Sequence, residues 1–233
     1  MNKKNLNPKI LCSKRIVVLI GKSASGKDTI KEELCKNYEF QYVVPYTTRP
    51  MRENEVDGKD YHFIKEGDED FRDRVVRGDF LEHRFFHFIK DGKKCWVGYA
   101  TPKIKERKGN FVIVNSIKGA EIIAARCSIN KCLIVYLDAD DEVRKNRAIQ
   151  RNKDFENAEW QRRLEADAKD YSEERLNKIE VLRIDTTNKS AAEIANEINE
   201  KSIELYLECQ KNRMALIKKR KEMRNKKLAG NNE

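Results

Sequence analysis

Runs of consecutive apolar residues recur along the chain and are separated by stretches with helical spacing. The runs cover residues 16–20, 111–114, 133–137 and, more briefly, 181–182. Short apolar runs separated in this way are typical of parallel strands that are buried on both faces. All four prolines and nine of the ten glycines precede residue 120, so we expect the second half to be mostly helical. The pattern predicts an α/β fold built on a parallel sheet.

A different pattern occupies residues 42–105, where apolar and polar positions alternate and aromatic residues and turn formers are frequent. Alternation with a period of two predicts strands with one exposed face. We therefore expect a small mixed or antiparallel subdomain inserted into the α/β core. From about residue 191 the pattern is helical to the end of the chain.

The segment after the first predicted strand has the form G-x-x-x-x-G-K and leads into a predicted helix. In such a loop the glycines let backbone N–H groups point at phosphate oxygens, and the lysine bridges the β- and γ-phosphates. The strand, loop and helix together predict a binding site for a nucleoside triphosphate. Its expected residues are Gly21, Ser23, Ala24, Ser25, Gly26, Lys27, Asp28 and Thr29.

The residue after the loop lysine is Asp28, where this motif ordinarily has Ser or Thr as a ligand of Mg²⁺. A carboxylate beside phosphates is repelled unless a cation lies between them. We therefore hypothesise that Asp28 holds Mg²⁺ directly or through water, with Thr29 as the lesser candidate. The alternative is that Asp28 only stabilises the N-terminus of the helix through the helix dipole.

Two arginines three residues apart, Arg49 and Arg52, flank a proline and are followed by Tyr61. Guanidinium groups and a hydroxyl in one loop are suited to binding a phosphate dianion; the alternative is a proline turn whose arginines face solvent. The stretch T-T-R-P-M-R-E-N-E-V-D-G-K-D-Y-H-F resembles the guanylate kinase pattern T-T-R-x-P-R-x-G-E-x-x-G-x-D-Y-x-F. This resemblance implies that Arg49, Arg52 and Tyr61 bind the phosphate of a nucleoside monophosphate.

The stretch G-D-F-L-E, which ends at Glu82, resembles the G-x-F-L-E of the same family, in which the glutamate receives the base. A carboxylate accepts hydrogen bonds from N1–H and the exocyclic amine of guanine, whereas adenine presents an acceptor at N1. The alternative is that Glu82 is an exposed partner on a strand edge. The family's Y-G-[ST] corresponds to V-G-Y at residues 97–99 or, with a shift, to Y-A-T at residues 99–101, so Tyr99 joins the expected acceptor site.

Two parts of the chain differ from the family pattern. Pro45 stands where the family has a serine that contacts the base, and V-N-S-I-K-G at residues 114–119 replaces D-x-D-x-Q-G with the loss of both carboxylates. The loop and the later strand are similar to those of ribose 1,5-bisphosphate phosphokinases, which carry G-K-D-S and V-N-G but lack the T-T-R-x-P-R signature. Loss of the strand carboxylates and gain of Asp28 are consistent with one relocation of the negative charge that holds the metal.

Arg147 and Arg151 are four residues apart on a predicted helix and so share a face, and Arg163 follows on the next helix. This arrangement resembles the lid of guanylate kinases, R-L-x-x-R followed by x-R-L, whose arginines close over the triphosphate. Phosphoryl transfer depends on positioning and charge neutralisation, so the resemblance implies that the catalytic residues are Lys27, Arg147, Arg151 and Arg163. The alternative is a solvated basic face. Residues 185–188 resemble the segment that borders the adenine of ATP.

The net charge of +10 is concentrated at the ends of the chain. Residues 1–9 contribute +3 and residues 211–233 contribute +7, so the body is neutral and no basic groove is expected on it. The basic end is either a solvated helix end or a contact for nucleic acid or an acidic partner. No apolar run approaches the ~20 residues of a membrane span, and no secretory signal is recognisable. Six cysteines without a C-x-x-C pair suggest reduced thiols rather than zinc ligands, in a cytoplasmic protein.

These features predict a P-loop NTPase core with an inserted acceptor-binding subdomain, a helical lid and a C-terminal helix. We expect a guanylate-kinase-like domain at residues 10–200, with the insertion at about 42–105 and the lid at about 142–165, and a basic helical extension at 201–233. The expected reaction is transfer of the γ-phosphoryl group of ATP, with Mg²⁺, to GMP or dGMP. The alternatives are another phosphorylated acceptor, such as ribose 1,5-bisphosphate, and a catalytically silent binding module. The sequence does not indicate the oligomeric state.

Overall fold

The computed structural model describes residues 14–53, 55–64, 68–90, 93–105, 109–127, 132–151 and 156–229. The basic residues 1–9, Cys12, the expected domain start at residue 10 and the last residues, 230–233, lie outside the described part. The described helices include none that is both long and apolar enough to cross a membrane.

A five-stranded sheet forms the core, in the order β2-β7-β1-β8-β9 with all neighbours parallel. Its strands are β1 (Lys14–Gly21), β2 (Phe40–Tyr42), β7 (Gly109–Val114), β8 (Cys132–Asp138) and β9 (Leu182–Asp185). Four of these coincide with the apolar runs, which confirms the predicted parallel sheet. The short β2 was not predicted, because its three residues carry no distinguishing run.

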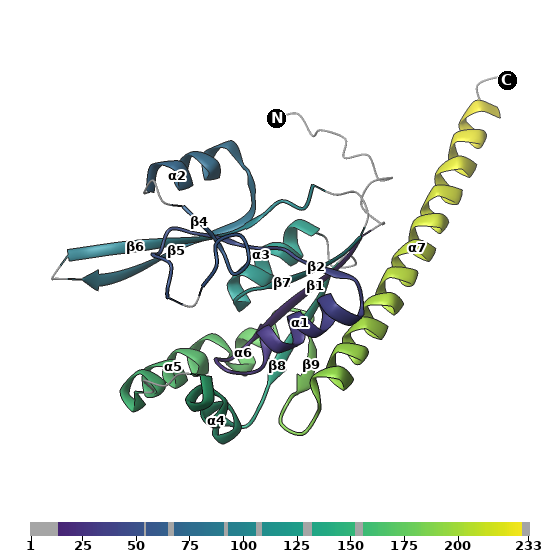
Figure 1. The fold of residues 1–233 in the computed structure, drawn as a ribbon. Helices are drawn as coiled ribbons and strands as arrows, with labels where there is room; N and C mark the ends of the chain where they lie inside the picture. Colours follow the sequence, from purple (N-terminus) through teal and green to yellow (C-terminus); the bar gives the residue numbers. More distant parts are fainter. Residues whose placement is uncertain are drawn as a thin grey trace.

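Helices cover both faces of this sheet (Figure 1). On one face, α1 (Lys27–Asn37) and the first part of α7 (Ala191–Ala229) pack against alternate residues of β1 and β8. On the other face, α3 (Ile117–Cys127) and the short α6 (Glu173–Leu176) enclose the remaining alternate residues. Burial on both faces is the physical reason that the strands read as continuous apolar runs.

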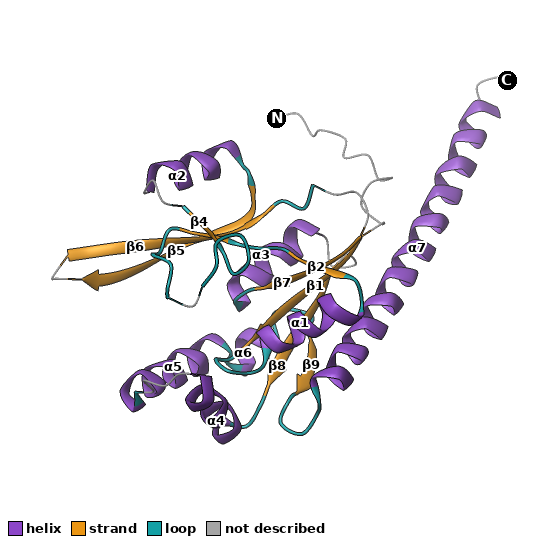
Figure 2. Cartoon of the chain, in the orientation of Figure 1, coloured by secondary structure: helices purple, strands orange, loops and turns teal. Residues whose placement is uncertain are grey.

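The region between β2 and β7 forms a second sheet, in the order β4-β3-β6-β5. It contains β3 (Tyr46–Thr47), β4 (His62–Phe63), α2 (Asp68–Arg77), β5 (Phe80–Lys90) and β6 (Lys93–Pro102). The β3–β4 pair is parallel and the other pairs are antiparallel, which confirms the predicted mixed subdomain. Figure 2 shows this sheet as a unit separate from the core sheet. It has its own small core of Phe71, Phe80 and Ala100.

Two helices, α4 (Asp141–Arg151) and α5 (Asn157–Asp170), follow β8 and occupy the predicted lid region. Trp160 of α5 is buried, and the ring of Tyr171 stacks on Tyr136 with centroids 5.5 Å apart. The second half of the chain is mostly helical, as the distribution of glycine and proline predicts. Residue 200, the expected end of the domain, lies inside α7, which continues through it without a break.

The insertion depends on a close approach between β6 and α2. A Cβ atom at Gly98 would lie 2.7 Å from the Phe71 ring. We predict that Gly98→Ala lowers the free energy of unfolding by about 1–3 kcal/mol through overpacking, as measured by urea denaturation. Adding Phe71→Leu makes room, so the double variant should lose less stability than the sum of the two single variants. Strict additivity would show that this contact is not the cause.

Candidate active site

The loop between β1 and α1 is shaped by a close contact with β8. Gly21 ends β1, and a Cβ atom there would lie 2.3 Å from the carbonyl oxygen of Leu137, so the position requires glycine. Lys27, the first residue of α1, turns its ammonium group back into the loop, where Nζ donates to the carbonyl oxygens of Gly21 (2.8 Å) and Lys22 (2.7 Å). The loop is therefore closed around the cation.

Enclosure of this ammonium group lowers the pKa of Lys27 to about 8, against the opposing effect of the carboxylates of Asp28 and Asp167. A buried cation with nearby carbonyl oxygens is stabilised further by an anion. The loop thus presents a positive charge and helix N-terminal amides to one point, which is the chemistry of phosphate binding.

A cavity of about 310 Å³ adjoins this loop, and we call it the loop cavity. Its lining includes Ala24, Gly26, Thr29, Arg147, Arg151 and Thr186. Arg147 donates to Thr186 through Nη1 to Oγ1 (3.1 Å) and through Nη2 to the carbonyl oxygen (2.7 Å). Helix α4 and the segment after β9 therefore meet at this cavity.

The predicted metal ligand Asp28 lies on the first turn of α1, next in the chain to Thr29 of the cavity lining. Its Oδ2 accepts a hydrogen bond from Nη2 of Arg151 at 3.1 Å, and both side chains are about half exposed or more. Arg163 lies on α5, where its Nε donates to Glu159 at 2.8 Å. The structure thus brings Arg147 and Arg151 to the loop, whereas Arg163 is paired within its own helix.

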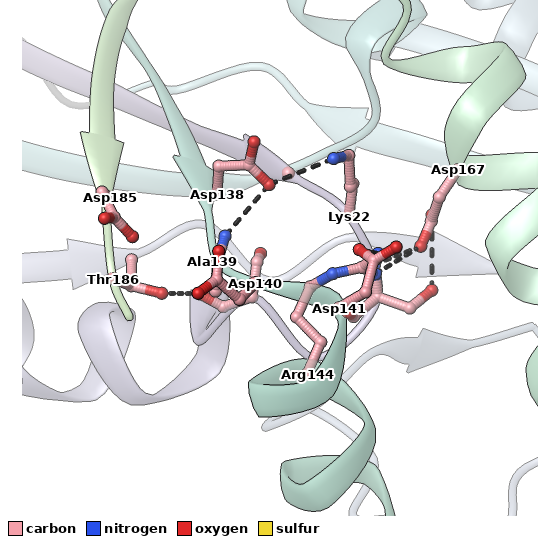
Figure 3. Close-up of polar contacts among 12 residues, drawn as sticks. Lys22, Asp138, Ala139, Asp140, Asp141, Arg144, Asp167, Asp185 and Thr186 are labelled. Atoms are coloured by element: carbon pink, nitrogen blue, oxygen red, sulfur yellow. Dashed lines mark hydrogen bonds and ion pairs between the residues drawn. The ribbon is translucent and has the colours of Figure 1, made fainter. Parts of the chain in front are cut away.

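A buried ion pair beside the loop was missed by the sequence reasoning. Arg144 of α4 is 1% exposed, and its Nη1 donates to Asp167 of α5 (3.1 Å) and to the carbonyl oxygen of Ser23 (3.1 Å). Asp167 also accepts the backbone N–H of Ser23 at 2.8 Å, and the contacts converge at one point in Figure 3. The only local signal is the pair Asp141–Arg144 at a spacing of three, because Asp167 lies far away in the sequence.

The predicted acceptor arginine Arg49 is held by a carboxylate. Its guanidinium forms a two-point ion pair with Glu55, one bond of which is 2.6 Å, and lies 4.9 Å from the centroid of the Tyr61 ring. The same pairing lowers the pKa of Glu55. Arg52 is exposed, and its backbone N–H donates to Glu55. Glu55 lies within the motif that identified the arginines, so its position there was available as a signal.

A second cavity, of about 430 Å³, lies between β5, β6 and the end of β7, and we call it the insertion cavity. Its lining includes Pro45, Tyr61, Glu82, Arg84, Phe86 and Tyr99. The predicted base-binding residue, Glu82, is 1% exposed and so is not an exposed partner on a strand edge. Its Oε1 accepts hydrogen bonds from Thr101 (2.7 Å) and Asn115 (2.8 Å).

Arg84 adds a positive charge to the insertion cavity that the sequence reasoning did not anticipate. Its Nε donates to Oε2 of Glu82 at 3.1 Å and its Nη2 donates to Oδ1 of Asn115 at 2.5 Å, while Nη1 bonds the Ser116 hydroxyl. A signal was present, because residues two apart on a strand share a face. Glu82, Arg84 and Phe86 therefore line one side of β5.

The two cavities lie at the carboxyl edge of the core sheet, beyond β1, β7 and β8. This edge is where ligands bind in open α/β sheets. The described residues contain no group of three or more His, Cys, Asp or Glu side chains placed to hold a metal ion.

Comparison with known proteins gives a consistent result. The sequence model of the guanylate kinase family matches residues 13–201. The chain is 33% identical to a guanylate kinase of Clostridium tetani over 146 residues (60% of this chain, 65% of that protein) and 33% identical to one of Thermotoga maritima over 156 residues (63% and 72%). It is 44% identical to a guanylate kinase of Chlorobium luteolum over 73 residues, 31% of this chain and 36% of that protein.

The matched segments span about one third of the Chlorobium luteolum protein and about two thirds of the Clostridium tetani protein. The crystal structure of a guanylate kinase from Anaplasma phagocytophilum shares the fold, with a TM-score of 0.56 at 21% identity over 82% of this chain and 85% of that one. Since the family match covers most of the chain and includes both the phosphate loop and the second, mixed sheet, this protein belongs to the guanylate kinase family.

Proposed function

We propose that this chain is an ATP-dependent nucleoside monophosphate kinase that phosphorylates GMP or dGMP. The observation that carries the proposal is the pair of cavities at one sheet edge. One is lined by a phosphate loop and two lid arginines, and the other by a phosphate-binding type of loop and a buried carboxylate. A donor and an acceptor nucleotide bound there would meet beside Lys27.

In this reaction an oxygen of the acceptor phosphate attacks the γ-phosphorus, and the bond to the ADP oxygen breaks. The protein contributes positioning and charge neutralisation rather than covalent chemistry. Lys27 exchanges the two carbonyl oxygens for oxygens of the β- and γ-phosphates. Arg147 and Arg151 cover the transferred group from α4, and Arg163 joins them when α5 moves with the lid. Arg49, Arg52 and Tyr61 hold the acceptor phosphate.

Asp28 fits the role of a single protein ligand of Mg²⁺, held with the nucleotide phosphates. Mg²⁺ is ordinarily bound by one or two carboxylates together with phosphate oxygens and water, and Asp28 is half exposed and paired with Arg151 of the cavity lining. The ion would neutralise charge on the phosphates, and Thr29 lines the same cavity as the lesser candidate. On metal binding, Asp28 would exchange its ion pair with Arg151 for a bond to the metal.

The insertion cavity supports guanine as the base. Along one edge, guanine presents two donors, the 2-amino group and N1–H, followed by two acceptors, O6 and N7. Glu82 and Arg84 offer an acceptor and a donor in the same order, and arginine binds O6 and N7 of guanine in a bidentate manner. Arg84 thereby supplies the donor that a proline at position 45 does not. Adenine alternates acceptor and donor along this edge and would leave one charged group unpaired.

We predict selective turnover when ADP production from Mg-ATP is measured with GMP, dGMP, AMP, CMP, UMP and ribose 1,5-bisphosphate separately. GMP and dGMP should be the substrates. Lys27→Met should lower kcat by at least about 100-fold, because it removes a charge that stabilises the transition state. Lys36→Met, an exposed change on the same helix, is the matched control. Folded protein that turns over no acceptor would favour the binding-module alternative.

Substrates with altered bases can separate a role of Arg84 in binding the base from a role in holding Glu82. For the wild type, we expect 7-deaza-GMP and 6-thio-GMP to lower kcat/KM by about 5- to 100-fold relative to GMP, because each weakens one acceptor. In Arg84→Met these two penalties should disappear, while the penalty for IMP, which lacks the 2-amino group facing Glu82, remains. Arg72→Met, in the insertion but beside Trp96, serves as the control. If both penalties stay unchanged in Arg84→Met, Arg84 does not bind the base and only positions Glu82.

Asp167 occupies a loop amide that a donor phosphate would use. We predict that Asp167→Asn lowers the KM for ATP several-fold, because it removes a negative charge beside the triphosphate. It should also lower the free energy of unfolding by about 1–3 kcal/mol, since a hydrogen bond to the charged Arg144 is weakened. Asp170→Asn, an exposed change on the same helix, should alter neither quantity appreciably. A loss of stability with an unchanged KM would make Asp167 purely structural.

A further inference from the structure

The buried anchor of the long C-terminal helix on the described core lies near the beginning of the helix. Ile194, Ala195 and Ile198 are buried in the core, and Nη1 of Arg15 on β1 donates to Asn199 (2.8 Å) and Ser202 (3.1 Å). The C-terminal end of the helix extends past the strands and helices of the core (Figure 1). The proposed kinase site uses none of this extension.

The extension carries an exposed apolar stripe, which we call the α7 stripe. It consists of Ile203, Leu207, Gln210, Met214 and Ile217, at successive spacings of four, three, four and three residues. The four apolar members are 39%, 52%, 67% and 37% exposed in that order. Spacings that alternate between three and four residues form the seam of a coiled coil.

The stripe faces away from the core. At about 100° per residue its five members fall within an arc of about 80°, and the centre of that arc is turned about 140° from the buried positions Ile194, Ile198 and Ser202. A second helix can therefore approach the stripe without meeting the rest of the domain.

Charged residues beside the stripe differ between its two halves. Glu204 flanks the first half, and Lys211 and Lys218 flank the second on the same side. If two stripes lie antiparallel with Gln210 at the centre, Glu204 of each copy lies opposite Lys218 of the partner subunit. A parallel pair would place like charges opposite each other. It would also bring together two ends that each carry +7 over residues 211–233.

We propose that the α7 stripe pairs with the α7 stripe of a second copy of this chain, in an antiparallel, two-fold symmetric contact centred on Gln210. Such a contact is isologous and closes as a dimer. The interface contains four large apolar side chains from each copy, which is small for a protein–protein contact. Association should therefore be weak, with a dissociation constant on the order of 10 µM.

Sedimentation equilibrium of the full chain from about 1 to 200 µM tests the pairing. The wild type should pass from monomer to dimer across this range. Leu207→Glu, in the stripe, should weaken dimerisation at least about tenfold. Leu216→Glu, on the opposite side of the same helix and similarly exposed at 49%, is the matched control and should leave it within about twofold. Both leucines are exposed, so neither change should disturb folding, and circular dichroism checks this.

Charge reversal tests the orientation. Glu204→Lys and Lys218→Glu should each weaken the dimer, and the two together should restore it, because an antiparallel pair regains both opposite-charge contacts. A parallel pair would keep like charges opposite in the double variant, so absence of rescue would overturn the antiparallel arrangement. A wild type that stays monomeric at the highest concentration, or equal effects of Leu207→Glu and Leu216→Glu, would overturn the pairing itself. A gel shift of nucleic acid by that monomer would assign the basic end to another partner.

Discussion

The close packing of β1 against β8 at Gly21 is the constraint on which the site depends. No side chain fits between this residue and the carbonyl oxygen of Leu137, so the chain leaves the sheet in a tight turn and enters α1 at once. That turn directs the Lys27 ammonium group and the helix N-terminus to one point beyond the sheet edge. The lid helix and the insertion are then placed around this point by β8 and β7.

Carboxylates hold four arginines at and beside the site in place. Glu55 binds Arg49, Glu82 binds Arg84, Asp167 binds Arg144 and Asp28 binds Arg151. Removing such charges from water is costly, and the pairing offsets the cost while fixing the geometry. Where a substrate phosphate takes over a carboxylate's role, the exchange of one anion for another conserves local charge. For the proposed kinase, this explains how a neutral body accommodates anionic substrates without a basic groove.

The local elements follow from the sequence. Apolar runs, glycine placement and alternation predicted the parallel sheet, the mixed insertion and the helical second half. The motifs also singled out the loop around Lys27, the arginines at positions 49 and 52, and Glu82 as site candidates. These features rest on neighbouring residues, whose spacing translates directly into a strand, a turn or a helix face. The short strand β2 was not predicted, because tertiary packing rather than local pattern decides it. The helical pattern from residue 191 predicted α7, but the expected domain end at residue 200 lies inside this helix, since no local pattern marks where the packing against the core stops.

The sequence by itself therefore determined the class of fold, the family and several of the residues that line the two cavities. Only the tertiary structure decided how those residues are paired. Asp167 meets the backbone of Ser23 across 144 positions, and Arg84 meets Asn115 across 31. Contacts between elements depend on how the sheets and helices pack, and no periodicity along the chain records that packing. The same reason hid the α7 stripe: whether an apolar helix face is covered is settled only when the core is assembled.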